Sequence, residues 1–458
     1  MNVSQLPTVL RHGLAAQWRW RRLDAARLAA YQERRAQQII VYAQQHSPFY
    51  RAHWRDHDRR AWHTLPTVDK GAMVAHFDQF NTVGVTQATA QQVAARAEQS
   101  RDFRPTLRTA QGQSVTAGLS SGTSGQRGLF LVTEAEIGAW AGVILARALH
   151  GLPWQGCRVA FFLRAFSNLY AGVNNPWLHL SYFDLSQPLD RAVTALNHFR
   201  PHLLVGPPSL LTALAAQKRA GALTITPQRL IAVAEVLEAH DEVQLQESFG
   251  VPVHQIYQCT EGLLAISCPR GRLHLQEDLV AVQLEPLPAL PGAAPRYTPI
   301  ITDLWRTTQP IIRYRLGDIL QVDPDPCPCG GSFRTLAAVE GRVADICYFT
   351  GLDGQRAPFY PALLSRLVRA SLPPAMDYQI VQAGDGQLQI YLTPLPTLAH
   401  EPFAQQVQQA VGAAIGAYGC QPPQVTVAYG LPPRLPMTKQ RRVQRLTEQA
   451  RMGDSCTL

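Results

Sequence analysis

The sequence predicts an α/β protein with a large N-terminal domain and a small α+β C-terminal domain. Helical patterns alternate with apolar strand-like runs, such as residues 158–163 and 203–205, which favours parallel or mixed sheets flanked by helices. The 458 residues exceed a single core, because a domain usually holds roughly 150 residues. A compositionally distinct segment follows Gly341-Arg342. We therefore expect domains at residues 1–343 and 344–458.

The large domain is expected to begin with helices and to continue into strands. Residues 14–50 follow an amphipathic helical pattern that ends at Ser47-Pro48. Short β-like runs occur between residues 104 and 132, on either side of a run rich in Ser, Thr and Gly. Residues 275–282 and 297–304 also look like strands, joined by a proline-rich connector at 286–295. These features predict a smaller β-rich subdomain within the large domain.

The C-terminal segment has the pattern of a small domain that can fold alone. Strand-like residues 378–381 and 388–392 precede a helical stretch at 403–418. Its length of about 110 residues is within the range of independent domains.

Composition narrows the class of protein. The chain is 46% hydrophobic and 16% charged, which is ordinary for a globular protein, and no apolar stretch approaches the roughly 18 residues that span a bilayer. Because no short apolar block resembles a secretory signal, we expect a cytoplasmic location. Eight scattered cysteines do not form a disulfide framework and should be mostly reduced.

The formal net charge of +9 is concentrated partly in the arginines of residues 11–35. No nucleic-acid-reading motif accompanies them, so we expect no nucleic-acid partner. A solvated helix face is the simplest interpretation, with an anionic ligand, membrane lipid or an acidic carrier protein as alternatives.

The run Ser120-Ser121-Gly122-Thr123-Ser124-Gly125-Gln126-Arg127-Gly128 predicts a loop that wraps phosphates. Glycine lets the backbone approach closely, and hydroxyl and amide groups donate to anionic oxygens. The run lacks the spacing of a Walker loop. Gly118 to Gly122 also fits the GxSxG pattern of α/β-hydrolases, but that pattern requires a helix directly after the serine, whereas residues 129–132 look like a strand.

Three further segments follow the loop in order: Tyr257-Gln258-Cys259-Thr260-Glu261-Gly262, then Arg313-Tyr314-Arg315-Leu316-Gly317-Asp318, then Gly341-Arg342. Together they resemble the adenylate-forming superfamily of acyl-CoA synthetases, peptide-synthetase adenylation domains and luciferases. The segments YAQQHSPFY (42–50), LPTVDK (65–70) and CPCG (327–330) are similar to phenylacetate-CoA ligases and to proteins allied to coenzyme F adenylating synthetases.

The resemblance implies an ATP-dependent acid–thiol ligase that forms an acyl-adenylate, releases pyrophosphate and transfers the acyl group to coenzyme A. Glu261 would hold Mg²⁺, and Thr260 would donate to the α-phosphate. Asp318 would accept from the ribose hydroxyls, and Arg342 would contact ribose or phosphate. The remaining implied ATP contacts are the phosphate-loop residues Ser120, Ser121, Gly122, Thr123, Ser124 and Gly125, with Tyr257 and Glu235 at the adenine.

Members of this superfamily close a mobile C-terminal domain that inserts a lysine. The counterpart here is Lys439, in LPMTKQRRVQR, although alignment on the upstream proline would select Arg442 instead. Asp345, after Gly341-Arg342, could serve as the pivot of this movement.

Cys268, His274, Cys327 and Cys329 offer the four ligands of a tetrahedral zinc site, through a Cys-x5-His pair and a later Cys-x-Cys. Four protein ligands would leave no open position, so the metal would be structural. Free buried thiols are the alternative.

The acyl substrate is less defined. An aromatic cluster that includes Phe161, Phe162, Phe166 and Tyr170 is placed by the resemblance near the acyl pocket, and the family favours an aryl or arylalkyl acid, but such clusters are often plain core. A carrier protein or an amine could replace coenzyme A as acceptor, and a non-catalytic ATP-binding relative is a further alternative. A homodimer is left open.

Overall fold

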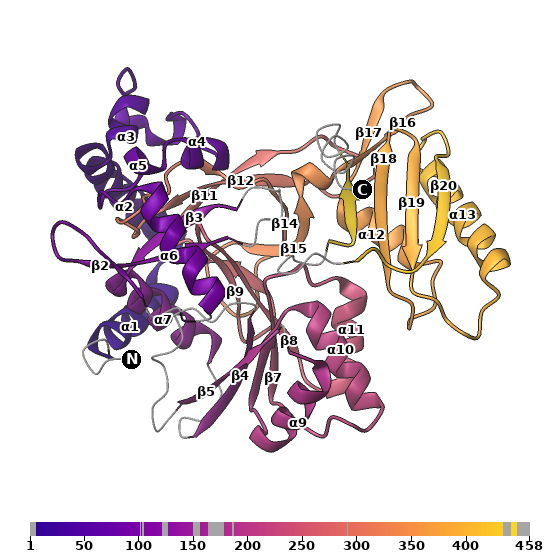
Figure 1. Cartoon of the computed structure of the whole chain (residues 1–458). Coiled ribbons are helices and arrows are strands. Elements are labelled where there is room, and N and C mark those ends of the chain that lie inside the picture. Colours follow the sequence, from indigo (N-terminus) through magenta and orange to yellow (C-terminus); the bar gives the residue numbers. More distant parts are fainter. Residues whose placement is uncertain are drawn as a thin grey trace. The chain divides into compact units, whose positions relative to one another are not determined.

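A computed structural model describes residues 6–100, 102, 105–120, 127–149, 156–163, 178–185, 187–290, 292–433 and 441–446 (Figure 1). The chain divides into two compact units. Unit 1 comprises residues 1–284, 299–316 and 322–337, and unit 2 comprises residues 285–298, 317–321 and 338–458. The expected division after residue 343 stays a prediction.

A mixed β-sheet has the strand order β11-β12-β14-β15-β10-β9-β8-β7-β6-β4-β5, with β13 paired to β12. The run β5-β4-β6-β7-β8 is parallel, and β8 pairs antiparallel with β9. The strands are β4 (Cys157–Leu163), β5 (Leu178–Asp184), β6 (Leu203–Gly206), β7 (Arg229–Val233), β8 (Val253–Cys259), β9 (Gly262–Ser267), β10 (Leu273–Leu275), β11 (Val280–Pro286), β12 (Tyr297–Asp303), β13 (Tyr314–Arg315), β14 (Asp318–Val322) and β15 (Thr335–Arg342).

Helices cover the parallel strands, as the alternating pattern predicts. They are α9 (Leu189–Phe199), α10 (Pro208–Arg219) and α11 (Ala239–Phe249). Their apolar residues join those of the strands in one core cluster that includes Phe162, Leu204 and Leu214. Phe162 is thus a core residue, in agreement with the simpler interpretation of the aromatic cluster, whereas Phe166 and Tyr170 lie outside the described residues.

The N-terminal part of unit 1 is helical and is followed by a three-stranded antiparallel sheet. Its elements are α1 (Leu6–Arg22), α2 (Ala25–His46), α3 (Pro48–His53), a short 3₁₀ helix (Arg59–Thr64), α4 (Lys70–Ala75), α5 (Phe77–Phe80), α6 (Gln87–Ser100), β1 (Leu107–Arg108), β2 (Ser114–Leu119), β3 (Leu129–Thr133) and α7 (Glu134–Ala148). The expected helix break at Ser47 is present, since Ser47 caps α3. The helical region begins earlier than the expected residue 14.

Helix α1 packs closely against α7. A Cβ atom on Gly13 would lie 3.1 Å from the carbonyl oxygen of Gly142, so the glycine permits the close approach. On the same face, Arg19 donates at 2.5 Å to Asp278, which also contacts Arg147 of α7 at 2.8 Å. Burial alone would raise the pKa of Asp278, but the guanidinium groups of Arg147 and Arg19 hold that pKa below its ordinary value. Arg19 is therefore internal and not part of a solvated basic face.

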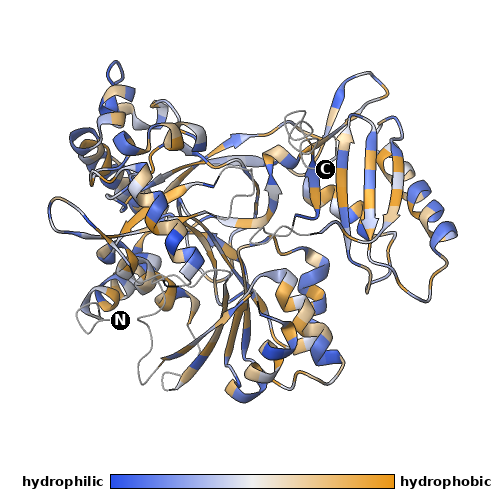
Figure 2. Ribbon diagram, in the orientation of Figure 1, coloured by the Kyte–Doolittle hydropathy of each residue, from blue (hydrophilic) through white to orange (hydrophobic). Residues whose placement is uncertain are grey.

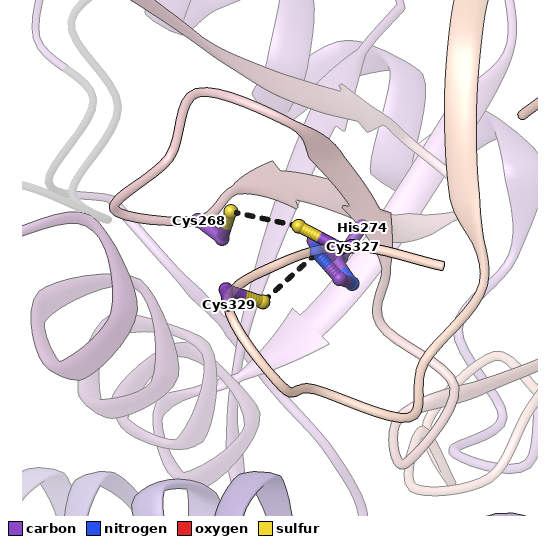
Figure 3. Close-up of side chains that lie close together, drawn as sticks. All are labelled: Cys268, His274, Cys327 and Cys329. Carbon is purple, nitrogen blue, oxygen red and sulfur yellow. Dashed lines mark hydrogen bonds between the residues drawn. The ribbon is translucent and has the colours of Figure 1, made fainter. Parts of the chain in front are cut away.

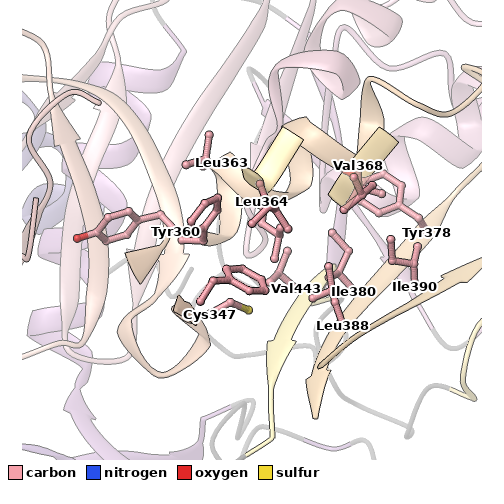
Figure 4. Close-up of a cluster of buried hydrophobic side chains, with 14 of the residues drawn as sticks. Cys347, Tyr360, Leu363, Leu364, Val368, Tyr378, Ile380, Leu388, Ile390 and Val443 are labelled. Atoms are coloured by element: carbon pink, nitrogen blue, oxygen red, sulfur yellow. The ribbon is translucent and has the colours of Figure 1, made fainter. Parts of the chain in front are cut away.

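Unit 2 has a core of its own, part of which is drawn in Figure 4, built around a four-stranded sheet in the order β20-β19-β18-β21. Apolar and polar residues alternate along these strands, which gives the banded colours of Figure 2. Two helices, α12 and α13, contribute buried residues to this core, among them Leu364, Val368 and Ile415. The elements are η3 (Val343–Asp345), β16 (Cys347–Thr350), β17 (Arg356–Phe359), α12 (Pro361–Arg369), β18 (Tyr378–Gly384), β19 (Gln387–Leu392), α13 (His400–Gly416), β20 (Gln424–Tyr429) and β21 (Val443–Arg445).

The predicted α/β class is confirmed, with one local difference. The strand expected at residues 275–282 is broken into β10 and β11, because Gln276, Glu277 and Asp278 form a buried polar turn between them. Within the described part of the chain, none of the helices combines the length and apolarity needed to cross a membrane.

Candidate active site

The predicted phosphate loop joins two antiparallel strands. Leu119 of β2 pairs with Leu129 of β3, and residues 121–126 between them, which include Ser121, Gly122, Thr123, Ser124 and Gly125, lie outside the described residues. At the base of the loop, the Ser120 amide donates to the Gly128 carbonyl at 2.7 Å, and the Gly128 amide donates to the Ser120 hydroxyl at 2.7 Å. Ser120 therefore fastens the two ends of the loop together.

This geometry does not match a hydrolase nucleophile. The serine of a GxSxG elbow stands between a strand and a helix, whereas Ser120 stands between paired strands and its hydroxyl already accepts a hydrogen bond. Gly118 has a different purpose, since the Phe130 ring of β3 occupies the place of a Cβ atom.

The rim of the loop is fixed by an ion pair. Arg127 donates to the Ser120 carbonyl at 2.8 Å and to both carboxylate oxygens of Glu98, at 2.7 and 2.5 Å. The hydrogen bonds that Arg127 donates to Glu98 raise the pKa of Arg127. These contacts attach the end of the loop to α6.

Thr260 and Glu261 form the tight turn between β8 and β9. The Thr260 hydroxyl donates to the Glu261 carboxylate at 2.8 Å, and the Tyr314 hydroxyl donates to its other oxygen at 3.0 Å. Burial, followed by the charge of Glu261, raises the pKa of Tyr314, so the phenol stays a donor at neutral pH. Two hydroxyl donors orient one carboxylate, which leaves oxygen lone pairs for a hard cation.

Arg306 connects this turn to the strand that follows the phosphate loop. Its buried guanidinium donates to the Thr260 carbonyl at 2.7 Å and to the Leu131 carbonyl of β3 at 3.0 Å. Gln309 completes the link, because its side-chain oxygen accepts from Arg306 and from the Leu131 amide, both at 3.0 Å. Sequence inspection missed Arg306, since it belongs to no motif, and an arginine nine-tenths buried is visible only in the fold.

Glu136 and Asp303 in turn hold the Arg306 segment. The Glu136 carboxylate accepts from the Thr307 amide at 2.8 Å and the Thr308 amide at 2.9 Å while closing the capping box of α7. Asp303 accepts from the amides of Trp305 and Arg306, and its burial raises its pKa to about 6.

Two segments that carry the family resemblance, residues 65–70 and 313–318, also form hydrogen bonds with each other. The LPTVDK segment (65–70) pairs with the segment that begins at Arg313. The Val68 amide donates to the Arg313 carbonyl at 3.0 Å, and the Arg315 amide donates to the Val68 carbonyl at 2.8 Å. Arg313 has a φ of 52°, a conformation that costs energy for a residue other than glycine.

The expected adenine-side residues lie at the ends of parallel strands. Ala234 follows β7 with a φ of 68°, and the adjacent Glu235 carboxylate accepts from the Ser209 amide at 3.2 Å, in the first turn of α10. Tyr257 lies in β8 beside a register shift between Tyr257 and Gln258. Strained backbone and β-bulges of this kind concentrate at functional sites.

Unit 2 contains the expected ribose-binding pair. Asp318 is buried, and Arg342 Nε lies 2.8 Å from its carboxylate. Asp345 forms an ion pair with Arg441. Arg442 lies 3.3 Å from Asp377 and 5.4 Å above the ring of Tyr378, whereas Lys439 lies outside the described residues.

Cys268, His274, Cys327 and Cys329 converge in unit 1, with all four ligand atoms within 4.8 Å of one another (Figure 3). The sulfur atoms of Cys268 and Cys327 are 3.7 Å apart, and Cys329 Sγ lies 3.4 Å from His274 Nε2. Neighbouring ligands of a tetrahedral zinc ion lie about 3.5–3.8 Å apart, given bonds of about 2.3 Å to sulfur and 2.0 Å to nitrogen. The spacing therefore fits zinc.

The surroundings of the cluster also orient the histidine for a metal. His274 Nδ1 lies 2.8 Å from the Phe333 carbonyl oxygen, an arrangement in which Nδ1 carries the proton and Nε2 is left as a ligand. Trp20 packs edge-on against the same ring, at 4.9 Å between centroids.

Comparisons with known proteins agree with this architecture. The chain is 26% identical over 239 residues to a phenylacetate-coenzyme A ligase of Thermus thermophilus. This match covers 48% of the chain and 51% of the relative, so it spans about half the length of that protein. No protein-family model matches the chain.

Solved structures extend the likeness to nearly the whole chain. A 2-hydroxyisobutyryl-CoA ligase in complex with an acyl-AMP superposes with a TM-score of 0.66 at 20% identity, covering 94% of this chain and 92% of the other. The chain has the fold of this CoA ligase. The predicted resemblance to the adenylate-forming superfamily and its phenylacetate-CoA ligase-like branch is confirmed. The GH3.15 acyl acid amido synthetase shares the fold with a TM-score of 0.58 at 11% identity, over 93% of this chain.

Proposed function

We propose that the protein is an ATP-dependent, AMP-forming acid–thiol ligase. The observation that carries the proposal is the Thr260–Glu261 turn, whose carboxylate is oriented by two hydroxyl donors and whose backbone is tied by Arg306 to the strand after the phosphate loop. In the first step, a carboxylate oxygen of the acid attacks the α-phosphorus of ATP and pyrophosphate leaves. In the second step, a thiol attacks the acyl carbon and AMP leaves.

The proposed roles of the residues follow from the negative charge of the two substrates. Acid and triphosphate repel each other, so the site must supply cations and donors where negative charge accumulates. We propose that Glu261 would hold Mg²⁺, whose charge would offset that of the phosphates. The Thr260 hydroxyl, which donates to Glu261 in this structure, would turn to donate to the α-phosphate when ATP binds, and Ser121, Thr123, Ser124 and Gly125 would hold the outer phosphates. Ser120 shapes the loop, because its hydroxyl is engaged at the base.

The contacts to the nucleoside are proposed from the family resemblance. We propose that Tyr257 and Glu235 border the adenine and that Asp318 accepts from the ribose hydroxyls, with Arg342 beside it. Arg342 Nε lies 2.8 Å from the buried Asp318 carboxylate, and a carboxylate offers acceptor oxygens for two hydroxyl groups.

Lys439 is the better candidate for the lysine that the C-terminal domain would insert. Arg442 is engaged within unit 2 by Asp377 and the face of Tyr378, and its backbone carbonyl accepts from the Ile380 amide. We infer from these contacts a structural role for Arg442, directly before the edge strand β21. We further propose that residues 344–458 move about the Asp345 region.

Zinc would be structural. The Cys268–His274–Cys327–Cys329 cluster fits a four-coordinate ion with no open position, so a bound zinc would join the β9–β10 turn to the segment before β15 and take no part in the reaction.

The acid is proposed to be aryl or arylalkyl, as the phenylacetate-coenzyme A ligase likeness suggests, and the acceptor to be coenzyme A. A carrier protein's thiol or an amine would use the same adenylate. The latter alternative is raised by the likeness to an acyl acid amido synthetase.

The proposal is tested by pyrophosphate release over a panel of aryl, arylalkyl and fatty acids, with and without coenzyme A. Wild type should release pyrophosphate with at least one acid, and Lys439→Ala should slow this step while Arg442→Ala leaves it nearly unchanged. Release with no acid would favour a non-catalytic protein, and loss only in Arg442→Ala would show that Arg442 is the inserted residue.

A further inference from the structure

Helix α1 has two different apolar faces. The inner face, with Val9, Gly13 and Ala16, packs against α7 and is buried. The outer face carries Leu10, Leu14 and Trp18, which are 56%, 73% and 61% exposed. Large apolar residues are common on surfaces one at a time, but three in one row mark a surface that contacts something else. We call these three residues the α1 ridge.

The ridge is continuous because its residues are four apart. At 3.6 residues per turn, Leu10, Leu14 and Trp18 fall within an arc of about 80° and extend about 12 Å along the helix. The other large exposed apolar residues found among the described residues, such as Val243 and Leu352, are widely separated from it in sequence. The inner face already supplies the packing of α1, so the fold does not require the ridge.

Arginines surround the ridge. Arg21 falls within the same arc, and Arg11 and Arg22 fall along one edge; all three are exposed. Helix α1 contains no acidic residue, and Asp24 after it caps α2. The arginine on the opposite face, Arg19, is neutralised internally by Asp278. The outer face therefore presents apolar side chains together with positive charge only.

We propose that the α1 ridge docks onto an anionic lipid membrane. A helix that lies flat can insert Leu and Trp side chains to one depth while arginines reach lipid phosphates, and neither contact needs a shaped partner. A second copy of the chain fits less well, because a two-fold pairing of this face would oppose arginines to arginines. The ridge is also short for a stable protein interface, which buries about 800 Å² per partner.

The test is co-sedimentation of the full chain with vesicles of phosphatidylglycerol and, separately, phosphatidylcholine. We expect binding to phosphatidylglycerol vesicles that is weakened at least about tenfold by Leu10→Ser/Leu14→Ser/Trp18→Ser, weakened by Arg11→Gln/Arg22→Gln, and reversed by high salt. The matched control, Val243→Ser/Leu352→Ser, removes equally exposed apolar residues elsewhere and should bind as wild type does. All variants replace exposed side chains, so their melting temperatures should match wild type.

Two results would overturn the proposal. One is no binding of wild type to phosphatidylglycerol vesicles, or equal binding by the ridge variant. The other is a wild-type dimer in sedimentation velocity that the ridge variant abolishes while vesicle binding persists, because the ridge would then be covered by a second copy.

Discussion

The Cys/His cluster and the Thr260–Glu261 turn lie in the same unit but are held in different ways. The cluster is self-contained: four ligands lie within 4.8 Å, and one carbonyl orients the histidine. The turn depends on side chains from distant segments, namely Arg306, Tyr314 and, through Arg306, Gln309 and Glu136. A self-contained site suits a structural metal, whereas a networked site transmits small displacements to the reacting atoms. Changes in the cluster should therefore alter stability, and changes at the turn should alter chemistry.

The largest effect is expected from Glu261→Gln. The amide keeps a hydrogen-bond acceptor for Tyr314 but loses the charge that would hold Mg²⁺, so acid-dependent pyrophosphate release should fall by about 10³-fold, which is about 4 kcal/mol. The melting temperature should change little. Steady-state rates and thermal unfolding, measured on the same preparation, distinguish a catalytic role of Glu261 from a structural role. A large loss of stability with a normal rate would show that the role is structural.

Arg306 should affect both properties, because it is buried and connects two parts of the site. Arg306→Met leaves the Thr260 and Leu131 carbonyls without their donor, so we expect a loss of about 3 kcal/mol in unfolding free energy and a raised KM for ATP. Arg306→Lys restores the charge and one donor and should recover part of the ATP affinity. Arg147→Met, at a buried ion pair facing α1, is the matched control and should destabilise the protein without changing KM for ATP.

Substitution of a cysteine in the cluster should lower stability and leave the reaction rate unchanged, the reverse of Glu261→Gln. Cys327→Ala should remove bound zinc, measured by mass spectrometry of the metal, and lower the unfolding free energy by about 3 kcal/mol. The folded fraction should keep its rate of adenylation. Cys157→Ala is the control, since Cys157 is buried in unit 1 outside the cluster. Equal metal content in wild type and Cys327→Ala would contradict the zinc assignment.

The smallest effect concerns pH. Burial raises the pKa of Asp303 to about 6, against an ordinary value of 3.8, so Asp303 contributes stability that is complete below about pH 4 and is lost as the pH rises through 6. Relative to Asp303→Asn, wild type should lose no more than about 3 kcal/mol between pH 4 and 8, since one pKa unit is worth about 1.4 kcal/mol. Denaturant titrations across this range check the slope, and the exposed Asp56→Asn should show none. A pH-independent difference for Asp303→Asn would show that folding does not raise the pKa of Asp303.

The sequence was most informative where function depends on short segments. The Cys-x5-His and Cys-x-Cys spacings predicted the four members of the cluster, and the ordered motifs predicted the fold that the comparisons confirm. It was least informative about buried charge. Arg19 and Arg35 belong to a basic stretch that reads as solvated, yet Arg19 pairs with Asp278 and Arg35 lies 4.2 Å above the Trp305 ring. Their partners are more than 200 residues away, so no local pattern identifies them.

Partners that are distant in sequence also explain the break between β10 and β11 and the hydrogen bonds that hold the Thr260–Glu261 turn. Residues 275–282 look like a strand, but Asp278 leaves the strand path because Arg147 and Arg19 meet it in the interior. Arg306 connects the turn to β3, two segments separated from it by 46 and 175 residues. Local periodicity carries no information about such long-range hydrogen bonds.

The central claim, that the carboxylate of an acid attacks the α-phosphorus of ATP, has a direct test. The acid that gives the fastest pyrophosphate release is supplied with ¹⁸O in its carboxyl group, and the AMP formed in the presence of coenzyme A is examined by mass spectrometry. The mechanism predicts one ¹⁸O atom in AMP for each thioester formed, and none in pyrophosphate. Unlabelled AMP, or label in pyrophosphate, would contradict an acyl-adenylate intermediate.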